Sequence, residues 1–329
     1  MIGKIKRRVQ SYLSRRKLAA GLRHVSGLQR IDLGPDAAGV VILAKDADGY
    51  LADCIDHHLA VGAAHVVVID AASADGTAAI GRGHPKVTVL ATVLPLALYE
   101  SGLRTSAARR VFQGGWILFA EPDELVEPPA PLNRLLAYAN EKGFTAVLGQ
   151  ILDFGPGASV ADSYPTARAA ASCTTEGQEW VAYGDPSFHL DWFTRLNHVT
   201  DPGVRMLAGG LRKLVFGEDP VLTKHVLVRN LAEVDLMSHP HCAGNVTVAD
   251  VTIAVRRYMF AGDWQARDRA SVRARTWEHG EDRKRLAVAA DPGFAFVVPS
   301  PQPWAGPRTL LDQGFLYASK AARSALDLT

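Results

Sequence analysis

The chain has 329 residues, of which 48% are hydrophobic and 21% charged, so it can bury a large core and is not disordered as a whole. Its 36 Lys and Arg against 34 Asp and Glu leave a net charge of only +2, and we therefore expect no nucleic-acid partner. Three scattered cysteines exclude a disulfide scaffold, and no apolar run approaches the roughly 20 residues that span a bilayer. These features predict a cytoplasmic protein with one large α/β domain or two modest domains.

The N-terminal 36 residues are expected to form a basic helical arm. Basic residues from Lys4 to Arg23 precede the first acid, Asp32, and apolar residues from Ile5 to Ala20 recur at helical spacing. Such a helix either lies on an anionic membrane surface, where each cation contributes about 1 kcal/mol, or packs lightly on the domain as a solvated helix. The first alternative makes the protein peripheral at the inner face of the cytoplasmic membrane.

From residue 39 to 152, short apolar runs alternate with segments of helical period. In chain order we expect strands at 40–44, 65–70, 86–90, 116–120 and 146–152, and helices over 51–59, after 77, over 100–113 and over 132–142. This alternation predicts an α/β fold with a mainly parallel, Rossmann-like sheet and helices on both faces. Ligands bind beyond the carboxyl ends of such strands, so we expect the chemistry in the loops after Ala44, Asp70 and Ala120. Neither a dinucleotide fingerprint nor a Walker A motif is present, so phosphate binding would need a metal.

The loop after Asp70 carries the first group of polar residues and ends at Thr77. Asp70 ends its strand, so its carboxylate is expected to point into the ligand crevice and accept a hydrogen bond from a nucleobase or a ribose hydroxyl. The alternative is an ordinary strand–helix turn. For Asp75 and Thr77 we prefer that alternative, with either residue capping the next helix.

A second acidic loop follows the strand at 116–120 and contains Glu121, Asp123 and Glu124. Clustered carboxylates raise one another's pKa, and a hard cation relieves their repulsion. Mg²⁺ and Mn²⁺ prefer oxygen ligands and are usually held by one or two carboxylates together with substrate phosphates. A metal here would offset the charge that develops on a leaving diphosphate. The alternative is an acidic surface turn.

Several stretches together resemble a known family. They are Lys45-Asp46-Ala47, Tyr50-Leu51, His57-His58, Gly62, the strand and loop from Val66 to Thr77, Trp116–Glu124, Gly209-Gly210-Leu211-Arg212, and Leu222-Thr223-Lys224 with the following Val226-Leu227-Val228-Arg229. This pattern resembles GT-A nucleotide-sugar glycosyltransferases of the family 2 type, and among them a bacterial subgroup related to family 92. The resemblance covers about residues 39–242 and is firm as far as Glu124.

The resemblance implies a GT-A fold and a set of donor-binding residues. Asp70 would contact the nucleotide base, and Lys45 and Asp46 would bind the donor beside it. Arg212 is a candidate for clamping a phosphate through two hydrogen bonds, with surface ion pairing as the alternative.

The same resemblance implies that Glu121 and Asp123 hold Mn²⁺ or Mg²⁺ against the diphosphate. His239, in a Ser-His-Pro-His turn, is the candidate histidine that closes the metal site, and a simple surface loop is its alternative. Three positions depart from the subgroup: Ala47 replaces a glutamate, Ala71 an asparagine, and Glu121 the first aspartate. These departures leave room for an altered donor site.

The second half of the chain offers fewer signals. Residues 180–192 combine aromatic and acidic side chains, as suits a sugar acceptor or a core edge, and Asp185 and Asp191 are the candidate general bases. We expect helices over 251–260 and 267–285, an irregular stretch at 291–308 and a terminal helix over 314–328. The expected division is an arm at 1–36, a GT-A-like domain at 37–245 and a helical, partly irregular extension at 246–329.

These observations and the resemblance predict a metal-assisted glycosyltransferase that moves a sugar from a nucleotide-diphosphate donor to a hydroxyl acceptor. The resemblance alone implies that the displacement is inverting. The acceptor is expected to be a glycan or a lipid-linked glycan, which would explain the basic arm. The competing hypothesis is a catalytically weakened nucleotide-sugar-binding or scaffold protein of the same fold. A nucleotidyltransferase is a third, but it would need a glycine-rich basic loop after the first strand, and residues 45–49 supply one lysine and one glycine.

Overall fold

The computed structural model describes residues 17–18, 20–156, 171–183, 185, 197–274, 276 and 280–328. Residues 1–16 of the expected basic arm and the candidate base Asp191 lie outside the described residues. No helix in the described ranges is both long and apolar enough to cross a bilayer.

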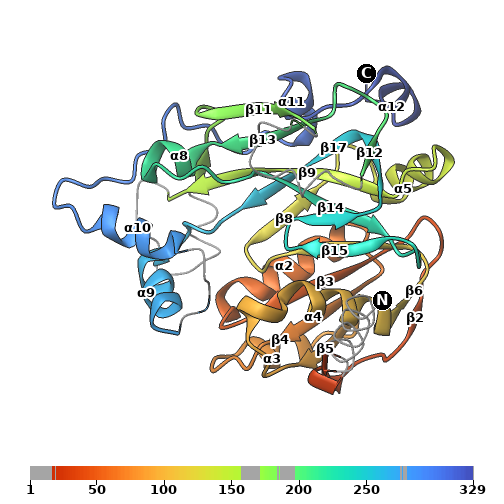
Figure 1. The fold of residues 1–329 in the computed structure, drawn as a ribbon, viewed down its shortest axis with the longest axis horizontal. Helices are drawn as coiled ribbons and strands as arrows, with labels where there is room; N and C mark the ends of the chain where they lie inside the picture. The colour runs from red at the N-terminus through yellow and green to blue at the C-terminus, as the bar shows by residue number, and fades with distance from the viewer. Residues whose placement is uncertain are drawn as a thin grey trace, which may run out of the picture.

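One mixed sheet forms the centre of the described structure (Figure 1). Its order is β1 (Arg23–Ser26), β5 (Val87–Ala91), β4 (His65–Asp70), β3 (Ala38–Ala44), β7 (Trp116–Ala120), β14 (Thr223–Arg229), β9 (Ala146–Gly155), β17 (Thr247–Arg257) and β12 (His198–Val199). β10 (Ser172–Cys173) pairs with β9, and β8 (Glu124–Glu127) pairs with β17. Strands β5, β4, β3 and β7 run parallel, and so do β9 and β17, whereas β14 lies antiparallel between β7 and β9. The sheet is therefore mainly parallel, as predicted.

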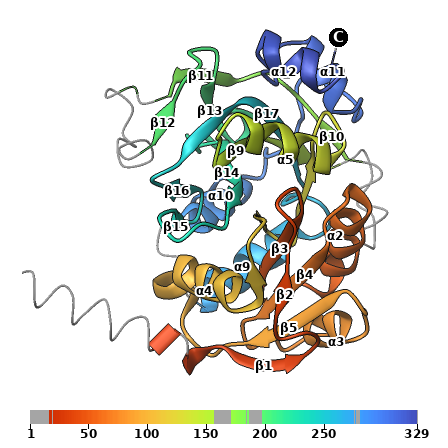
Figure 2. The same cartoon turned by 90° about the vertical axis from the view of Figure 1, so that its right-hand side faces the viewer.

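Helices cover both faces of this sheet, as the sequence predicts. On β3, Val40 and Ile42 pack with α2 (Asp48–Val61), and α3 (Thr77–Arg82) and α5 (Leu132–Glu141) lie on the same face. Val41 and Leu43 point to the other face, where they pack with α4 (Leu96–Val111). Figure 2 shows α4 on one side of β3, β4 and β5, and α2 and α3 on the other. The fully buried apolar run of β3 follows from this double cover.

Three small antiparallel or parallel pairs and five further helices complete the described structure. The pairs are β2 (Ile31–Asp32) with β6 (Phe112–Gln113), β11 (Gln178–Ala182) with β13 (Arg205–Gly209), and β15 (Asp235–His239) with β16 (Cys242–Gly244). The helices are α8 (Leu211–Phe216), α9 (Trp264–Ala274), α10 (Glu281–Ala289), α11 (Pro307–Asp312) and α12 (Lys320–Ala325). Figure 1 shows α9 and α10 at one side of the molecule, away from α11 and α12.

The elements expected between residues 39 and 152 are confirmed, with boundaries shifted by a few residues. The largest shift is at α4, which begins at Leu96 instead of 100. Gly62 ends α2 in the left-handed region, with φ of 112°, where glycine carries no steric penalty.

The helix expected over 251–260 is wrong, because this segment is most of β17. Residues 248–255 are all buried, and a strand buried on both faces reads as a continuous apolar run without alternation. The terminal helix expected over 314–328 is confirmed only as the six residues of α12. β17 belongs to the central sheet, although it lies beyond residue 245; the division of the chain into three parts stays a prediction.

His57 and His58 lie on α2 and connect this helix to β8 through hydrogen bonds. The Nδ1–H of His58 donates to the Cys54 carbonyl (2.7 Å), and its Nε2 accepts from the Val126 amide (3.4 Å). His57 Nε2 lies 2.9 Å from the Val126 carbonyl. Burial, followed by the neighbouring His57, lowers the pKa of His58 to about 3. His58 is therefore a neutral structural histidine.

This buried histidine predicts a loss of stability in mild acid. The pKa of His58 is about 3 in the folded protein and about 6.5 in the unfolded chain, so the unfolded chain binds more protons between these values. The free energy of unfolding is therefore unaffected by His58 well above pH 6.5 and falls as the pH drops below this value. Between pH 7 and pH 5 the loss from His58 is roughly 2 kcal/mol. His58→Gln cannot be protonated, so urea unfolding of this variant should depend less on pH.

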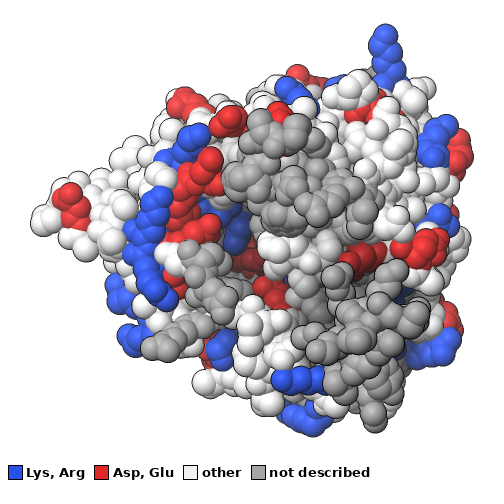
Figure 3. Space-filling model, in the orientation of Figure 1, with Lys and Arg blue, Asp and Glu red and all other residues white. Residues whose placement is uncertain are grey.

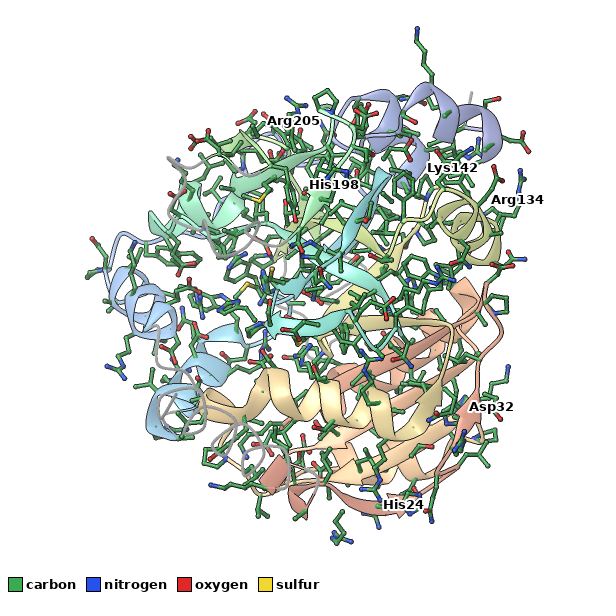
Figure 4. The ribbon with its side chains drawn as sticks, turned by 45° about the vertical axis from the view of Figure 1, so that its right-hand side comes forward. His24, Asp32, Arg134, Lys142, His198 and Arg205 are labelled. Carbon is green, nitrogen blue, oxygen red and sulfur yellow. The ribbon has the colours of Figure 1, made fainter. Side chains whose placement is uncertain are left out.

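The same substitution at His198, an exposed histidine that Figure 4 labels, is the control and should keep the wild-type slope. A His58→Gln variant that loses stability with falling pH as steeply as the wild type would contradict this account.

Candidate active site

A cavity of about 1010 Å³ opens beyond the carboxyl ends of β3 and β7, where the sequence predicts the ligand site. Its lining residues come from six stretches of the chain, within 45–50, 97–102, 121–123, 212–221, 238–241 and 257–285. Figure 3 shows acidic and basic side chains next to one another around a hollow in this face of the molecule. The volume is at the upper end of what small-molecule sites occupy.

Six of the predicted site residues line this cavity: Lys45, Asp46, Glu121, Asp123, Arg212 and His239. Asp70 and Asp185 are not among the lining residues, and Asp191 is outside the described part of the chain. Asp70 is buried at the end of β4, and its Oδ1 accepts a hydrogen bond from the Ser73 amide (3.1 Å). The roles predicted for these residues stay predictions.

The loops after β3 and β4 hold each other in place through hydrogen bonds from backbone amides to side-chain oxygens. The Asp46 amide donates to Ser73 Oγ (2.9 Å), and the Ala74 amide donates to Asp46 Oδ1 (2.7 Å). The Ala47 amide donates to Thr77 Oγ1 (2.7 Å). Asp46 has a positive φ of 49°, a conformation that aspartate tolerates better than most residues. One carboxylate oxygen of Asp46 is therefore already used in shaping the loop.

Asp75 and Thr77 lie in the turn that begins α3, as preferred from the sequence, but the N-cap residue of this helix is Gly76, so neither residue caps it as expected. Asp75 Oδ1 accepts from the Thr77 amide (2.9 Å), and Asp75 Oδ2 accepts from the Asp48 amide (3.1 Å). These bonds satisfy amides at the beginnings of α3 and α2, which have no partner inside their helices.

The second acidic loop is fixed from below by a buried ion pair. Lys224 Nζ lies 2.5 Å from Glu124 Oε2, and the two side chains are 1% and 0% exposed. The same carboxylate oxygen accepts from the Glu121 amide (3.0 Å), and the Tyr258 amide donates to the Asp123 carbonyl (2.9 Å). The loop is thus tied to β14 and to the end of β17, so Glu121 and Asp123 are held at the cavity wall.

Arg257 lies between the two carboxylates that line the cavity. Its Nη2 is 3.3 Å from Glu121 Oε2, and its Nε is 3.9 Å from Asp123 Oδ2. Although burial would raise the pKa of Glu121, the nearby cations of Arg257, Lys224 and Arg104 together outweigh it and hold that pKa well below its usual range. Burial raises the pKa of Asp123 to about 6, and the carboxylates of Glu121 and Glu124 add to this increase.

Arg212 supplies a second cation at the cavity wall. It is buried on α8, and its Nε donates to Asp153 Oδ2 at 2.9 Å. Its Nη2 is also buried and has no hydrogen-bond partner among the described residues. An unsatisfied buried guanidinium nitrogen is costly unless a ligand completes its hydrogen bonding. The buried pair with Asp153 corrects the alternative of a surface ion pair.

The two histidines of the β15–β16 turn both line the cavity, but they differ in their surroundings. His239 is exposed, and partial burial of its ring lowers its pKa. Burial lowers the pKa of His241 well below its usual value, and the cations of Lys224, Arg257 and Arg212 lower it further. The carboxylate of Glu121 acts in the opposite direction. His241 is therefore the neutral histidine that faces the charged centre of the site, whereas the sequence analysis favoured His239.

The described side chains do not supply a metal site of the expected kind. No group of three or more His, Cys, Asp and Glu side chains in the described ranges could hold a metal ion. Glu121 and Asp123 instead share the Arg257 guanidinium. The residues present therefore fit a side-chain cation better than Mn²⁺ or Mg²⁺.

Sequence reasoning missed Arg257 because its segment was expected to be helical. The available signal was the Arg256-Arg257 pair directly after an apolar run, which is the same strand-end arrangement that drew attention to Glu121 and Asp123. Lys224, which belongs to one of the stretches that carry the resemblance, forms a buried ion pair with Glu124.

Comparison with known proteins gives no family assignment. No family model matches the chain, and no curated protein matches it. Among solved structures, S. aureus TarS has a TM-score of 0.28 and 19% identity over 37% of this chain and 22% of that chain. Mannosyl-3-phosphoglycerate synthase from Rubrobacter xylanophilus has a TM-score of 0.26 and 19% identity over 45% of each chain. A UDP-glucose pyrophosphorylase complexed with UDP-glucose has a TM-score of 0.23 and 8% identity over 64% of this chain and 74% of that chain. The chain thus spans less than half the length of the first two structures.

The buried Lys224–Glu124 pair predicts a large loss of stability when its cation is removed. Lys224→Met leaves the Glu124 carboxylate buried without a charge partner, so the free energy of unfolding should fall by about 3–5 kcal/mol in urea titrations. In the double variant with Glu124→Gln, part of this loss should return, because no uncompensated charge remains.

Arg134→Met is the matched control, because Arg134 forms an exposed ion pair with Asp327 and lies at the surface on α5 (Figure 4). Its loss should stay within about 1 kcal/mol. Equal losses in the Lys224 and Arg134 variants would show that the buried pair does not fix the loop.

Proposed function

We propose that this chain is a GT-A-like glycosyltransferase that uses a nucleotide-diphosphate sugar. The observation that carries the proposal is the cavity beyond β3 and β7, which is lined by Lys45, Arg212 and Arg257 together with the carboxylates of Glu121 and Asp123. A cavity at the carboxyl ends of parallel strands is the usual ligand position in such sheets. Its cations suit a diphosphate, and its volume suits a ligand of nucleotide-sugar size.

The proposed reaction is a single inverting displacement. The acceptor hydroxyl oxygen forms a bond to the anomeric carbon while the bond from that carbon to the diphosphate oxygen breaks, and the hydroxyl proton passes to a general base. The leaving nucleoside diphosphate takes the bonding electron pair, and the guanidinium groups of Arg212 and Arg257 stabilise its added charge. Asp185 and Asp191 remain the candidate bases.

Donor binding can be measured by the change in melting temperature with a panel of nucleotide sugars. A ligand at about a hundred times its Kd adds about 2.7 kcal/mol of stability, so at least one donor should raise the Tm clearly. Lys45→Ala should reduce this increase, because Lys45 lines the cavity. Lys142→Ala, at an exposed residue following α5, is the control and should retain it (Figure 4).

No shift with any nucleotide sugar would contradict the proposed function. Release of the nucleoside diphosphate in the presence of an acceptor would support transfer over the competing scaffold role. A donor that binds but is neither hydrolysed nor transferred would instead favour a nucleotide-sugar-binding protein of the same fold.

The surface next to the cavity favours an anionic membrane as a second partner. Lys17 Nζ donates to the Tyr99 hydroxyl on α4 (2.7 Å), the helix whose first turns line the cavity. Val93, in the loop before α4, and Leu98, on α4 itself, are 87% and 67% exposed. Basic residues beside exposed apolar ones suit the surface of an anionic bilayer, where a lipid-linked glycan acceptor would be found.

Vesicle flotation tests this membrane proposal. The full chain should float with vesicles containing phosphatidylglycerol but remain behind with vesicles of phosphatidylcholine alone. The Val93→Ser, Leu98→Ser double variant should float less, because it loses both exposed apolar side chains. Equal behaviour with the two vesicle types would contradict an electrostatic membrane contact.

A further inference from the structure

The position of Arg257 follows from the strand that carries it. Arg257 is the last residue of β17, where it lies opposite Glu124 of β8 and Asp153 of β9. The next amide, that of Tyr258, donates to the Asp123 carbonyl (2.9 Å). The backbone on both sides of Arg257 is therefore fixed relative to the acidic loop, and its side chain enters the site from a rigid strand.

The guanidinium of Arg257 occupies the place of a cation shared by two carboxylates. It contacts Glu121 at 3.3 Å and Asp123 at 3.9 Å, and its side chain is only 13% exposed. Its Nε has no hydrogen-bond partner among the described residues. A divalent ion bound to the same two carboxylates would lie beside a fixed positive charge, and the electrostatic repulsion would oppose its binding.

Two more arginines at the cavity keep positive charge available for a ligand. Arg267 donates to the carbonyls of Met259 and Ala261, both at 2.7 Å, and forms no ion pair within the described ranges. Arg212 has one carboxylate partner, Asp153, and a buried Nη2 without a hydrogen bond among the described residues. Arginine donors arranged in this way match the oxygens of a diphosphate.

We propose that the donor diphosphate is bound without a divalent cation, by Arg257 together with Arg212 and Arg267. Arg257 then supplies the positive charge at the diphosphate, and Glu121 and Asp123 orient its guanidinium. This inference rests on the proposed function, because it names how the same cavity binds its donor.

Nucleoside diphosphate binding to the full chain, measured by calorimetry with UDP, GDP, ADP and TDP, tests the inference. The wild type should bind at least one of them with the same Kd, within about threefold, in EDTA and in Mn²⁺. Arg257→Met should weaken binding in EDTA by at least about tenfold, because a charged hydrogen-bond partner is lost. Added Mn²⁺ should restore part of this loss, since Glu121 and Asp123 are then free of their cation.

Arg256→Met is the matched control. Arg256 is the preceding residue of β17, has a similar exposure of 12%, and pairs with Glu127 instead of the cavity carboxylates. Its guanidinium lies over the Trp304 ring, 4.9 Å from the ring centre. Binding to this variant should equal that of the wild type. Arg257→Lys keeps a cation and should bind more tightly than Arg257→Met, which separates loss of charge from loss of folding.

The outcomes are distinct. Wild-type binding that is abolished by EDTA and restored by Mn²⁺ would overturn the inference but leave the proposed function intact. Binding to Arg257→Met in EDTA at wild-type strength would also overturn it. The absence of binding by any nucleoside diphosphate in either condition would overturn both the inference and the proposed function.

Discussion

The buried ion pair between Glu124 and Lys224 fixes the loop that carries Glu121 and Asp123, and the rest of the site depends on it. Glu124 is fully buried, and its carboxylate is neutralised by Lys224 while it also accepts the Glu121 amide. An unpaired carboxylate at this depth would be strongly destabilising, so the loop, β14 and β8 must keep their relative positions. The antiparallel strand β14, which interrupts the parallel order of the sheet, is the element that delivers Lys224.

This constraint determines what the neighbouring residues can do. With Glu124 facing inward, Glu121 and Asp123 face the cavity, where Arg257 from β17 meets both of them. The charged centre of the site is thus assembled from the loop and strand that follow β7, from β14 and from β17, which are far apart in the sequence. Each of its charges has a partner on a different strand, which is how a site acquires rigid geometry before any ligand arrives.

Much of the N-terminal half could be predicted from the sequence, because its signals are local. The apolar run at 40–44 and the strand ending at Asp70 identify buried parallel strands, and the acids after Ala120 identify a strand end. Strand ends of a parallel sheet meet at one edge, so Lys45, Glu121 and Asp123 line one cavity, whereas Asp70, expected beside them, is not among its lining residues. Arg257 was missed because a strand buried on both faces has no period that separates it from a helix, so the Arg256-Arg257 pair was not recognised as a strand end. The pairing of Lys224 with Glu124 depends on contacts 100 residues apart, which no local pattern encodes.

A crystal structure of the full chain with a nucleotide-diphosphate sugar, grown in the presence of Mn²⁺, tests the central claim most directly. The account predicts the diphosphate in the cavity beyond β3 and β7, with its oxygens within hydrogen-bond distance of Arg257 and Arg212 and no metal between Glu121 and Asp123. A nucleotide bound outside this cavity, or a manganese ion held by those two carboxylates, would contradict it.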